Sequence, residues 1–418
     1  MRFLVAILLA VLTASATITK RAAINRDNFP ERLWPTDKPI PYRFSSDFSD
    51  ISDMRDVMET IASWTCLSFK DVTTESDVKE ANGSIQSTIV FVNSTECTTE
   101  RISTASNTAT VYISLAEATC RMPYVFYRVM LRTLGMEYTH VRPDRDEYIS
   151  VHEEDIKPEN LEEFRKVSGF KVSTYGVPYD FDSLMHISPE VYEKTEGIPT
   201  MVAKDPLHQP GMGLNFGVPS HSDYLLLNRL YRCLDRCAGL ETNCEYGGFP
   251  NPNNCTSCIC PWGFAGQSCN EMDGCGESVS STTSWQRFSV KSTNEAPLCF
   301  WFLTAPPGRK IEIQLEKIVP DDPLCQYQPY TWLEVRLGNF VVGGYKFFCN
   351  AHIPNHTLIS EGNLAVLSAQ HIDVPIEVEL SFRNVEATSF RNVEATSKST
   401  GSIFGLSVVI GVCSLLLL

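Results

Sequence analysis

The chain has 418 residues, of which 43% are hydrophobic and 10% are aromatic, and its formal net charge is −15. This length is too great for one hydrophobic core and predicts several domains. The acidic excess excludes the basic surface that is typical of nucleic-acid-binding proteins, so we expect no nucleic-acid partner.

The N-terminal residues have the order of a secretory signal. Arg2 precedes an apolar run at 3–12, and small residues at 14–16 form a cleavage site. The apolar run is too short to cross roughly 30 Å of hydrocarbon, which argues against a membrane anchor. We therefore predict a signal peptide at 1–16 and secretion, followed by a short pro-segment at 17–21 that ends in two basic residues.

The next elements belong to a large first domain. Thr110–Leu115 alternates between apolar and polar residues and predicts a strand, and a second helix with apolar residues between 125 and 134 ends at Gly135. An earlier amphipathic helix is predicted by apolar residues at helical spacing, namely Met54, Val57, Met58, Ile61 and Trp64.

The spacing of the 15 cysteines divides the chain further. Four widely spread cysteines, the last of them Cys233, suit a large domain. Six more crowd into residues 237–269, a segment that is too short to be stable without cross-links. Four others lie between 275 and 349, among alternating apolar stretches at 310–315 and 333–337 that predict a β-sandwich. A secreted chain with this pattern is expected to be disulfide-bonded.

Three blocks in the large domain resemble the astacin family of zinc endopeptidases. They are RPDRDEYI at 142–149, PYDFDSLMH at 178–186 and VAKDP at 202–206. The resemblance covers residues 22–234 and implies an α+β metzincin fold. Residues 235–270 resemble an EGF-like module and residues 275–384 resemble an all-β CUB sandwich, so the expected protein is multidomain.

These resemblances also imply the disulfide pairing. The expected pairs are Cys66–Cys233, Cys97–Cys120, Cys237–Cys255, Cys244–Cys258, Cys260–Cys269, Cys275–Cys299 and Cys325–Cys349. Some CUB domains bind calcium, but Thr331 stands where the family usually has an acidic residue, which argues against calcium here.

The zinc signature of the family is H-E-x-x-H-x-x-G-x-x-H. Aligning Gly135 with its glycine places Arg128, Arg132 and Tyr138 at the three ligand positions and Val129 at the general base. Arginine stays protonated and offers no lone pair to a metal, and valine cannot accept a proton. We therefore expect neither zinc nor another cofactor.

Two further positions depart from the family. The Met-turn keeps Met185 but has Ile187 in place of a tyrosine, and Thr139 replaces the glutamate that holds the processed N-terminus in active relatives. A shifted signature is excluded because no H-E-x-x-H occurs in the chain. A relocated zinc site is the remaining alternative, for which the histidines of this domain would be the donors: His140, His152, His186, His208 and His221.

Arg128 and Arg132 share a helix face because they are four residues apart. One interpretation is that they are solvated or paired with a neighbour such as Glu137. The other is an anion site that binds an acidic side chain or a C-terminal carboxylate.

The end of the chain suggests a tether. An octapeptide, SFRNVEAT, occurs at 381–388 and again at 389–396, within a predicted linker at 385–402. The apolar residues 403–418 follow small and polar residues, an order that resembles a glycolipid-attachment signal, with a tail anchor or neither as alternatives. Sequons predict glycosylation at Asn82, Asn93, Asn254 and Asn355.

The sequence supports two alternative functions. The first is an inactive astacin-type protein that binds an extracellular protein or peptide, either secreted or held at the outer cell surface. The second is a zinc endopeptidase that cleaves extracellular proteins, as family membership alone implies.

Overall fold

The computed structural model describes residues 23–74, 87–95, 97–99, 110–117, 120–321 and 331–387. Several sequence predictions lie outside these ranges: the signal peptide, the pro-segment, Asn82, Cys325, the second octapeptide and the apolar tail. In the part of the chain that is described, no helix combines the length and the apolar character needed to cross a membrane.

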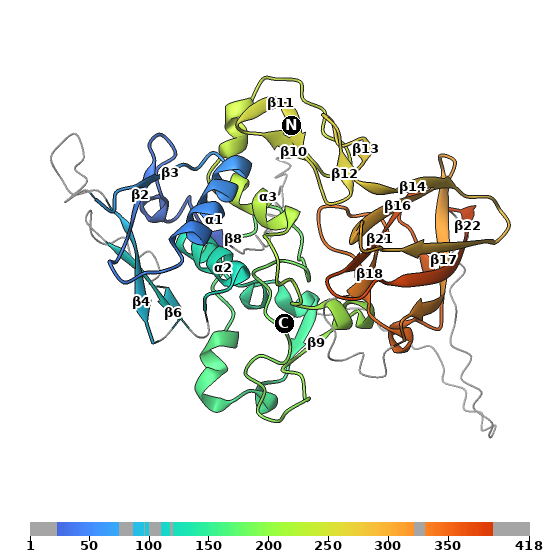
Figure 1. Cartoon of the computed structure of the whole chain (residues 1–418), viewed down its shortest axis with the longest axis horizontal. Helices are drawn as coiled ribbons and strands as arrows, with labels where there is room; N and C mark the ends of the chain where they lie inside the picture. The colour runs from blue at the N-terminus through green and yellow to red at the C-terminus, as the bar shows by residue number, and fades with distance from the viewer. Residues whose placement is uncertain are drawn as a thin grey trace, which may run out of the picture.

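The first domain is built on a mixed sheet with the strand order β3-β2-β4-β6-β5. Its central neighbours run parallel, and β5 is antiparallel to β6. Figure 1 shows this sheet beside helices α1 and α2. The strands are β2 (Ile40–Phe44), β3 (Phe69–Asp71), β4 (Ile89–Ser94), β5 (Thr98–Thr99) and β6 (Val111–Ala116).

Helix α1 (Ile51–Trp64) matches the first predicted helix. Four of its five predicted apolar residues are buried, while Trp64 is partly exposed and stacks on Tyr224, with 5.1 Å between the ring centres. Helix α2 (Pro123–Thr133) and helix α3 (His221–Leu230) pack into the same core.

Below this core, short segments form a second cluster around the Met-turn. Its paired strands are β7 (Ile149–Val151) and β9 (Met201–Ala203). Strand β1 (Ala23–Ile24) pairs with β8 (Val172–Ser173), and Ala23 packs into the first core. The connecting 3₁₀ helices are η1 (Pro30–Arg32), η2 (Thr139–Val141), η3 (Arg145–Glu147), η4 (Glu153–Asp155), η5 (Pro158–Phe164), η6 (Pro206–Gly211) and η7 (Cys233–Cys237).

The middle module consists of two short hairpins. Strand β10 (Phe249–Asn251) pairs with β11 (Asn254–Ile259), and β12 (Phe264–Ala265) pairs with β13 (Glu271–Met272). Its side chains reach both neighbouring domains. In particular, Phe264 packs between Phe302 and Phe340 of the last domain, at ring-centre distances of 4.9 and 5.1 Å.

The last domain is a sandwich of two sheets, with strand orders β14-β16-β21-β18-β19 and β15-β22-β17-β20. Apolar residues of both inner faces form its core. The strands are β14 (Cys275–Ser280), β15 (Gln286–Lys291), β16 (Leu298–Thr304), β17 (Arg309–Val319), β18 (Thr331–Arg336), β19 (Tyr345–Phe347), β20 (Leu358–Ile359), β21 (Leu364–His371) and β22 (Glu377–Glu386), with η9 (Asn350–His352) between β19 and β20.

Strand β22 changes the interpretation of the octapeptide repeat. The first copy begins inside this strand, where Phe382 is buried and Arg309–Val319 pairs with Glu377–Glu386. This copy is therefore mostly part of the sandwich, and the sandwich extends two residues past the predicted boundary at 384.

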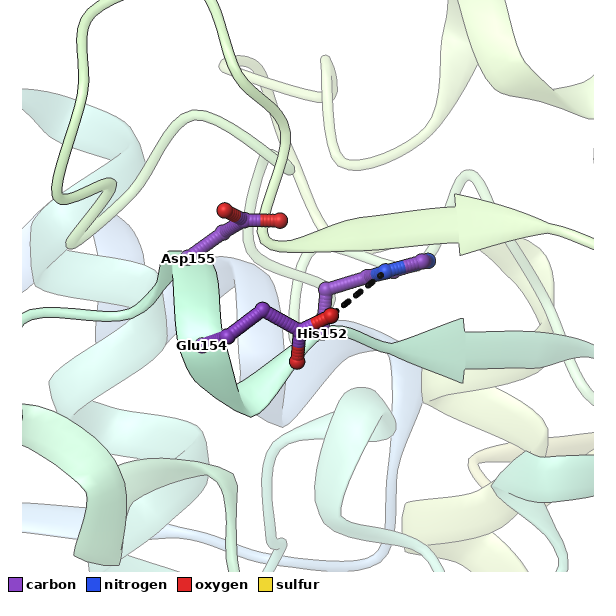
Figure 2. Close-up of side chains that lie close together, drawn as sticks. All are labelled: His152, Glu154 and Asp155. Atoms are coloured by element: carbon purple, nitrogen blue, oxygen red, sulfur yellow. Dashed lines mark ion pairs between the residues drawn. The ribbon is translucent and has the colours of Figure 1, made fainter.

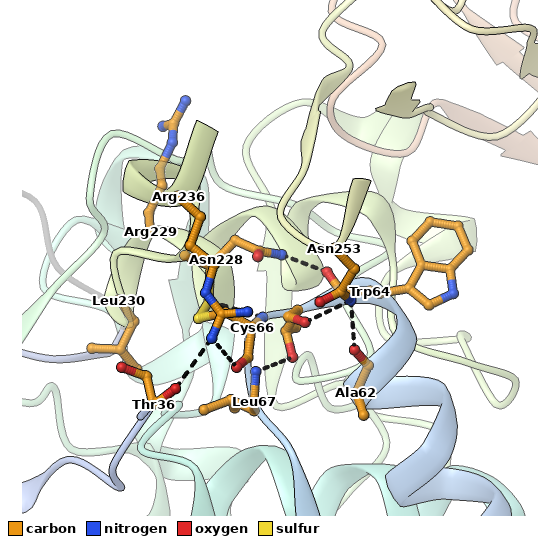
Figure 3. The surroundings of a disulfide bond; sticks show 12 residues. Thr36, Ala62, Trp64, Cys66, Leu67, Asn228, Arg229, Leu230, Arg236 and Asn253 are labelled. Carbon is orange, nitrogen blue, oxygen red and sulfur yellow. Dashed lines mark hydrogen bonds between the residues drawn. A yellow bond between two sulfur atoms is a disulfide. The ribbon is translucent and has the colours of Figure 1, made fainter. Parts of the chain in front are cut away.

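Six of the seven disulfides that the resemblances imply lie among the described residues, and all six are present. The seventh pair includes Cys325, which lies outside them. Cys66–Cys233 ties the end of α1 to the end of the first domain. Around it, Asn253 of the middle module donates to the carbonyls of Ala62, Ser63 and Thr65 at 2.9–3.1 Å (Figure 3). These carbonyls end helix α1 and need such donors, so the middle module caps this helix.

Candidate functional site

Helix α2 carries the residues that the sequence places at the zinc and base positions. It begins at Pro123, whose fixed φ suits the first helical turn, and it ends at Thr133. Gly135 follows with φ +95°, and a Cβ there would lie 2.8 Å from Ile24 Cδ1, so only glycine fits this turn. The helix therefore ends where the sequence predicts.

Arg128 does not extend into open solvent. Its Nε donates to the carbonyl of Leu184 at 2.7 Å, and its Nη2 donates to that of His186 at 3.3 Å. The guanidinium also lies over the ring of Tyr124, 5.2 Å from its centre. Burial lowers the pKa of Arg128 from its usual value, but an arginine in proteins keeps its proton. The residue thus bridges α2 to the Met-turn through backbone carbonyls.

Arg132 pairs with Glu137, one of the two interpretations made from the sequence. Both side chains are largely buried, and the guanidinium lies 4.8 Å from the ring centre of Tyr138. A ligand anion would have to compete with Glu137 for this arginine. The anion site at Arg128 and Arg132 stays a prediction, which these internal partners do not favour.

The Met-turn is held from beneath by a buried carboxylate. Asp223 accepts hydrogen bonds from Ser183 Oγ at 2.6 Å and from the backbone N–H of Leu184 at 2.8 Å. The backbone N–H of Thr139 donates to the carbonyl of Met185 at 2.8 Å, which joins the turn to the segment after α2. Burial raises the pKa of Asp223.

His186 has both ring nitrogens in use. Its Nε2 accepts from the hydroxyl of Tyr179 at 2.8 Å, and its Nδ1 donates to the carbonyl of Ile187 at 2.8 Å. Burial is the main cause that lowers its pKa to about 4. His186 therefore has no lone pair left for a metal.

His140 is the other buried histidine near the old ligand positions. Its Nε2 donates to the carbonyl of Glu163 at 2.9 Å, and its Nδ1 has no hydrogen-bond partner among the described residues. Its ring centre lies 6.5 Å from that of His186. Burial lowers its pKa to about 3, so the ring stays neutral. A single free nitrogen does not make a zinc site.

The residues around α2 do not fit a zinc ion. Arg128 and Arg132 are cations without lone pairs, and the aliphatic side chain of Val129 is buried in the core. Zinc requires three or four neutral or anionic donors converging on one point. Leu184 and His186 supply carbonyl oxygens there, but Arg128 already uses them.

A separate cluster could in principle hold a metal. His152, Glu154 and Asp155 offer ligand atoms within 4.8 Å of one another, on the turn between β7 and η5 (Figure 2). His152 Nδ1 lies 3.6 Å from Glu154 Oε1, and Glu154 is exposed. Such exposed groups are common without a metal, so this cluster does not replace the α2 site.

The remaining predicted positions are distributed over the surface and the sandwich. Thr331 uses its hydroxyl to donate to the carbonyl of Val374 at 3.0 Å, and nothing in the structure tests calcium binding there. The sequons at Asn93, Asn254 and Asn355 are exposed, as glycosylation requires. His208 stacks on Phe181 and packs at a tilt against Tyr345 of the sandwich, with ring-centre distances of 4.2 and 4.6 Å.

Comparison with known proteins identifies the first domain. The family model named astacin, which describes a peptidase family, matches residues 26–232. The chain is 29% identical to zinc metalloproteinase nas-27 of Caenorhabditis elegans over 81% of this chain and 83% of that protein, and 27% identical to nas-29 of the same organism over 88% and 69%. A similar solved structure is high choriolytic enzyme 1, a hatching-enzyme zinc protease of Oryzias latipes, with 22% identity, 48% and 94% coverage and a TM-score of 0.38.

Proposed function

Because residues 26–232 belong to the astacin family, we propose that the chain is a catalytically inactive family member that binds an extracellular protein or peptide. The chain is a homologue of zinc metalloproteinases, with a disulfide-rich module and an all-β sandwich after the protease-like domain. The proposed binding function does not use a metal.

The observation that carries the proposal is the environment of Arg128 and Arg132. Two largely buried cations occupy the positions of two neutral ligands, so each position has lost a lone-pair donor and gained a positive charge. Their partners, Glu137 and the Met-turn carbonyls, balance them internally. Both guanidinium groups thus have partners within the first domain.

The proton chemistry of the family is missing as well. Val129 cannot take a proton from water, and its carbonyl accepts from Thr133 Oγ1 at 2.8 Å within the helix. Thr139, at the position of the family's N-terminal clamp, uses its hydroxyl to donate to Ser183 at 3.1 Å. Hydrolysis would therefore need both a metal and a base from elsewhere.

We place the protein outside the cell. The predicted signal at 1–16 and the disulfides indicate an oxidising compartment. A membrane tether through residues 403–418 belongs to the same proposal.

The alternative is an active zinc endopeptidase, and it is supported by the names of the relatives. An active enzyme would need metal ligands from residues other than Arg128, Arg132 and Tyr138. The cluster of His152, Glu154 and Asp155 is the described group that this alternative would have to use.

The test uses protein secreted by cells that express the full chain. Purified protein is incubated with denatured casein, with and without a zinc chelator, beside an active astacin as the positive control. We expect no chelator-sensitive cleavage, and we expect the same protein to capture a specific partner from an extracellular protein extract. Chelator-sensitive cleavage at a rate near that of the control would refute the proposal.

A further inference from the structure

The sandwich ends in a strand whose last part occurs twice in the chain. Strand β22 includes most of the octapeptide SFRNVEAT at 381–388, which we call the first copy. The same eight residues follow directly at 389–396, outside the described residues, and we call them the second copy. The second copy therefore carries the same side chains, in the same order, as the end of a strand that belongs to the sandwich.

Side chains of the first copy that face the core hold it in the sandwich. Phe382 is buried in this core, where β22 pairs with β17 at Ile313 on one side and with β15 at Gln286 on the other. Asn384 is also buried, and its Nδ2 donates to the carbonyl of Ser281 at 2.8 Å. Each of these contacts depends on one side chain of the octapeptide.

Polar side chains of the first copy also have partners on neighbouring strands. Arg383 Nε donates to Glu312 Oε2 at 2.7 Å, and its guanidinium lies 4.4 Å from the ring centre of Trp285. The hydroxyl of Ser381 donates to Glu316. A strand that is formed by the second copy would offer identical groups to these partners. The equivalent residues of the second copy are Ser389, Phe390, Arg391 and Asn392.

Residues before the repeat exclude a slip of the whole strand by eight positions. Such a slip would place Glu386 at the position of Val378 and Thr388 at that of Leu380, and both of these positions are buried in the core. A carboxylate there would lose its hydration without gaining a partner. The second copy can therefore enter the sheet only if the residues up to Leu380 stay in place and the first copy is looped out.

The sheet is already irregular at the point where such a loop would leave it. The pairing of β17 with β22 shifts between Leu315 and Lys317, opposite Glu379 and Leu380. A bulge interrupts the ladder of hydrogen bonds and bends the strand, so the parts of β22 before and after this point are held separately. The entropy cost of closing a loop rises only slowly with its length. The arrangement with the loop thus lies above the observed one by the cost of closing this loop.

We propose that the second copy is an alternative end for strand β22, which replaces residues 381–388 in the sandwich while the first copy forms a loop. The exchange changes the length of the linker that leads to the apolar residues 403–418. This linker runs from 389 to 402 in the observed arrangement and from 397 to 402 after the exchange. The loss of eight residues shortens its reach by up to about 28 Å. The proposal goes beyond the binding function above and does not depend on it.

The first test is a cycle of substitutions at the two equivalent phenylalanines of the full chain, secreted and purified. The double variant Phe382→Ala, Phe390→Ala should lose at least about 10 °C in its unfolding midpoint, because neither copy then supplies the core ring. Phe382→Ala alone should lose less than about half of this, because the second copy replaces the first. Phe390→Ala is the matched control and should unfold like the wild type. Equal losses in Phe382→Ala and in the double variant would overturn the proposal.

Limited trypsin digestion reports the arrangement directly and needs only the single variants. Trypsin cleaves after arginine, and Arg383 and Arg391 occupy the same position in the two copies. In the wild type and in Phe390→Ala, mass spectrometry of the fragments should show the first cut of the repeat after Arg391. In Phe382→Ala the preference should reverse, because Arg383 then lies in the loop and Arg391 in the strand. A first cut after Arg391 in the folded Phe382→Ala variant would refute the exchange, even if the double variant does not fold.

Size-exclusion chromatography of Phe382→Ala distinguishes an exchange within one chain from an exchange between two chains. The second copy is connected directly to the first, so its effective concentration at the strand position is far above that of another chain. We therefore expect the same elution volume as for the wild type. Stability that is retained only in a larger species would contradict the proposed exchange within one chain.

Discussion

The surroundings of α2 and the contact between the first domain and the sandwich both pair their buried charges, but over different distances in the chain. At α2, the guanidinium groups of Arg128 and Arg132 turn inward to carbonyls and to Glu137. Where the sandwich contacts the first domain, Lys346 pairs with Asp182, which lies 164 residues earlier in the chain. A site that balances all its charges internally offers a ligand little. The cation of Arg132 is thus balanced within the first domain, whereas Asp182 is balanced only while the sandwich contacts that domain.

The largest effect should follow from restoring the zinc signature. The variant Arg128→His, Val129→Glu, Arg132→His, Tyr138→His recreates every position of the signature around Gly135. Since the Met-turn and its support by Asp223 are in place, we expect about one zinc per chain and stabilisation of at least about 4 kcal/mol at saturating zinc. Metal analysis and thermal unfolding with and without zinc measure both.

If this folded variant binds no zinc, the backbone around α2 differs from that of an active astacin. The substituted side chains alone would then not explain why zinc is not bound. Arg128→Ala with Arg132→Ala serves as the control, because it removes the two cations without supplying any ligand.

A fall in pH should change the contributions of the buried histidines and of Asp182 to stability in opposite directions. Burial lowers the pKa of His140 to about 3 and those of His186 and His221 to about 4, so these rings are neutral in the folded protein and take up protons only on unfolding. Their contribution to stability is complete above pH 6.5 and is lost as the pH falls toward 4, by about 1.4 kcal/mol per pH unit for each histidine. The midpoint of thermal unfolding, followed from pH 7 to 4, should fall.

At the contact between the first domain and the sandwich, burial raises the pKa of Asp182 to about 6 despite its pair with Lys346. This group contributes stability that is present below its unfolded pKa and is lost as the pH rises through 6, which offsets part of the fall toward acid. His221→Phe should flatten the fall, because it removes one of the histidines whose pKa burial lowers. An unfolding midpoint that stays constant between pH 7 and 4 would show that the histidines are accessible to water.

The next largest effect is expected for the buried ion pair between Arg142 and Asp144. Arg142 donates to both oxygens of Asp144 at 2.9 Å, and both side chains are buried. Arg142→Ala leaves a buried carboxylate without its cation and should cost about 3–5 kcal/mol in unfolding free energy, measured by urea unfolding. Arg165→Ala, which removes an exposed pair with Glu162, should change stability by less than about 1 kcal/mol. Similar losses in both variants would contradict the buried position of Arg142.

A smaller effect is expected at Arg132. Arg132→Ala leaves Glu137 largely buried without this cation and should cost about 1–3 kcal/mol. The double variant with Glu137→Ala should recover part of this loss, because the pair interacts directly. Additive losses in the double-mutant cycle would show that the two side chains do not depend on each other, and would leave Arg132 free to bind an anion.

Local features of the fold could be predicted from the sequence. The helical spacing between Met54 and Trp64 gave α1, the glycine after the apolar run gave the end of α2, and the alternation at 110–115 gave β6 within one residue. These features depend on neighbours in the chain, and so their patterns are visible there. The partner of Arg132 is only five residues away and was predictable for the same reason.

Apart from the disulfides that the family resemblances imply, contacts between distant segments could not be predicted. Arg128 binds carbonyls 56 and 58 residues away, and Asn253 caps a helix about 190 residues earlier. Asp182 pairs with Lys346 of another domain. Every residue has a backbone carbonyl, so the sequence does not show which of them accepts a hydrogen bond from a distant side chain. Contacts between domains form only where the domains meet. The buried charges on the outer face of β18, Glu334 and Arg336, were the one available sign that this face is covered.

The central claim is that the α2 position no longer holds zinc, and one measurement tests it directly. The wild-type protein, secreted in zinc-supplemented medium and purified without chelator, is analysed for bound metal beside an active astacin. The charge and the missing donors at Arg128, Arg132 and Tyr138 predict zinc far below one ion per chain. One tightly bound zinc per chain, lost together with casein cleavage on chelation, would contradict the account.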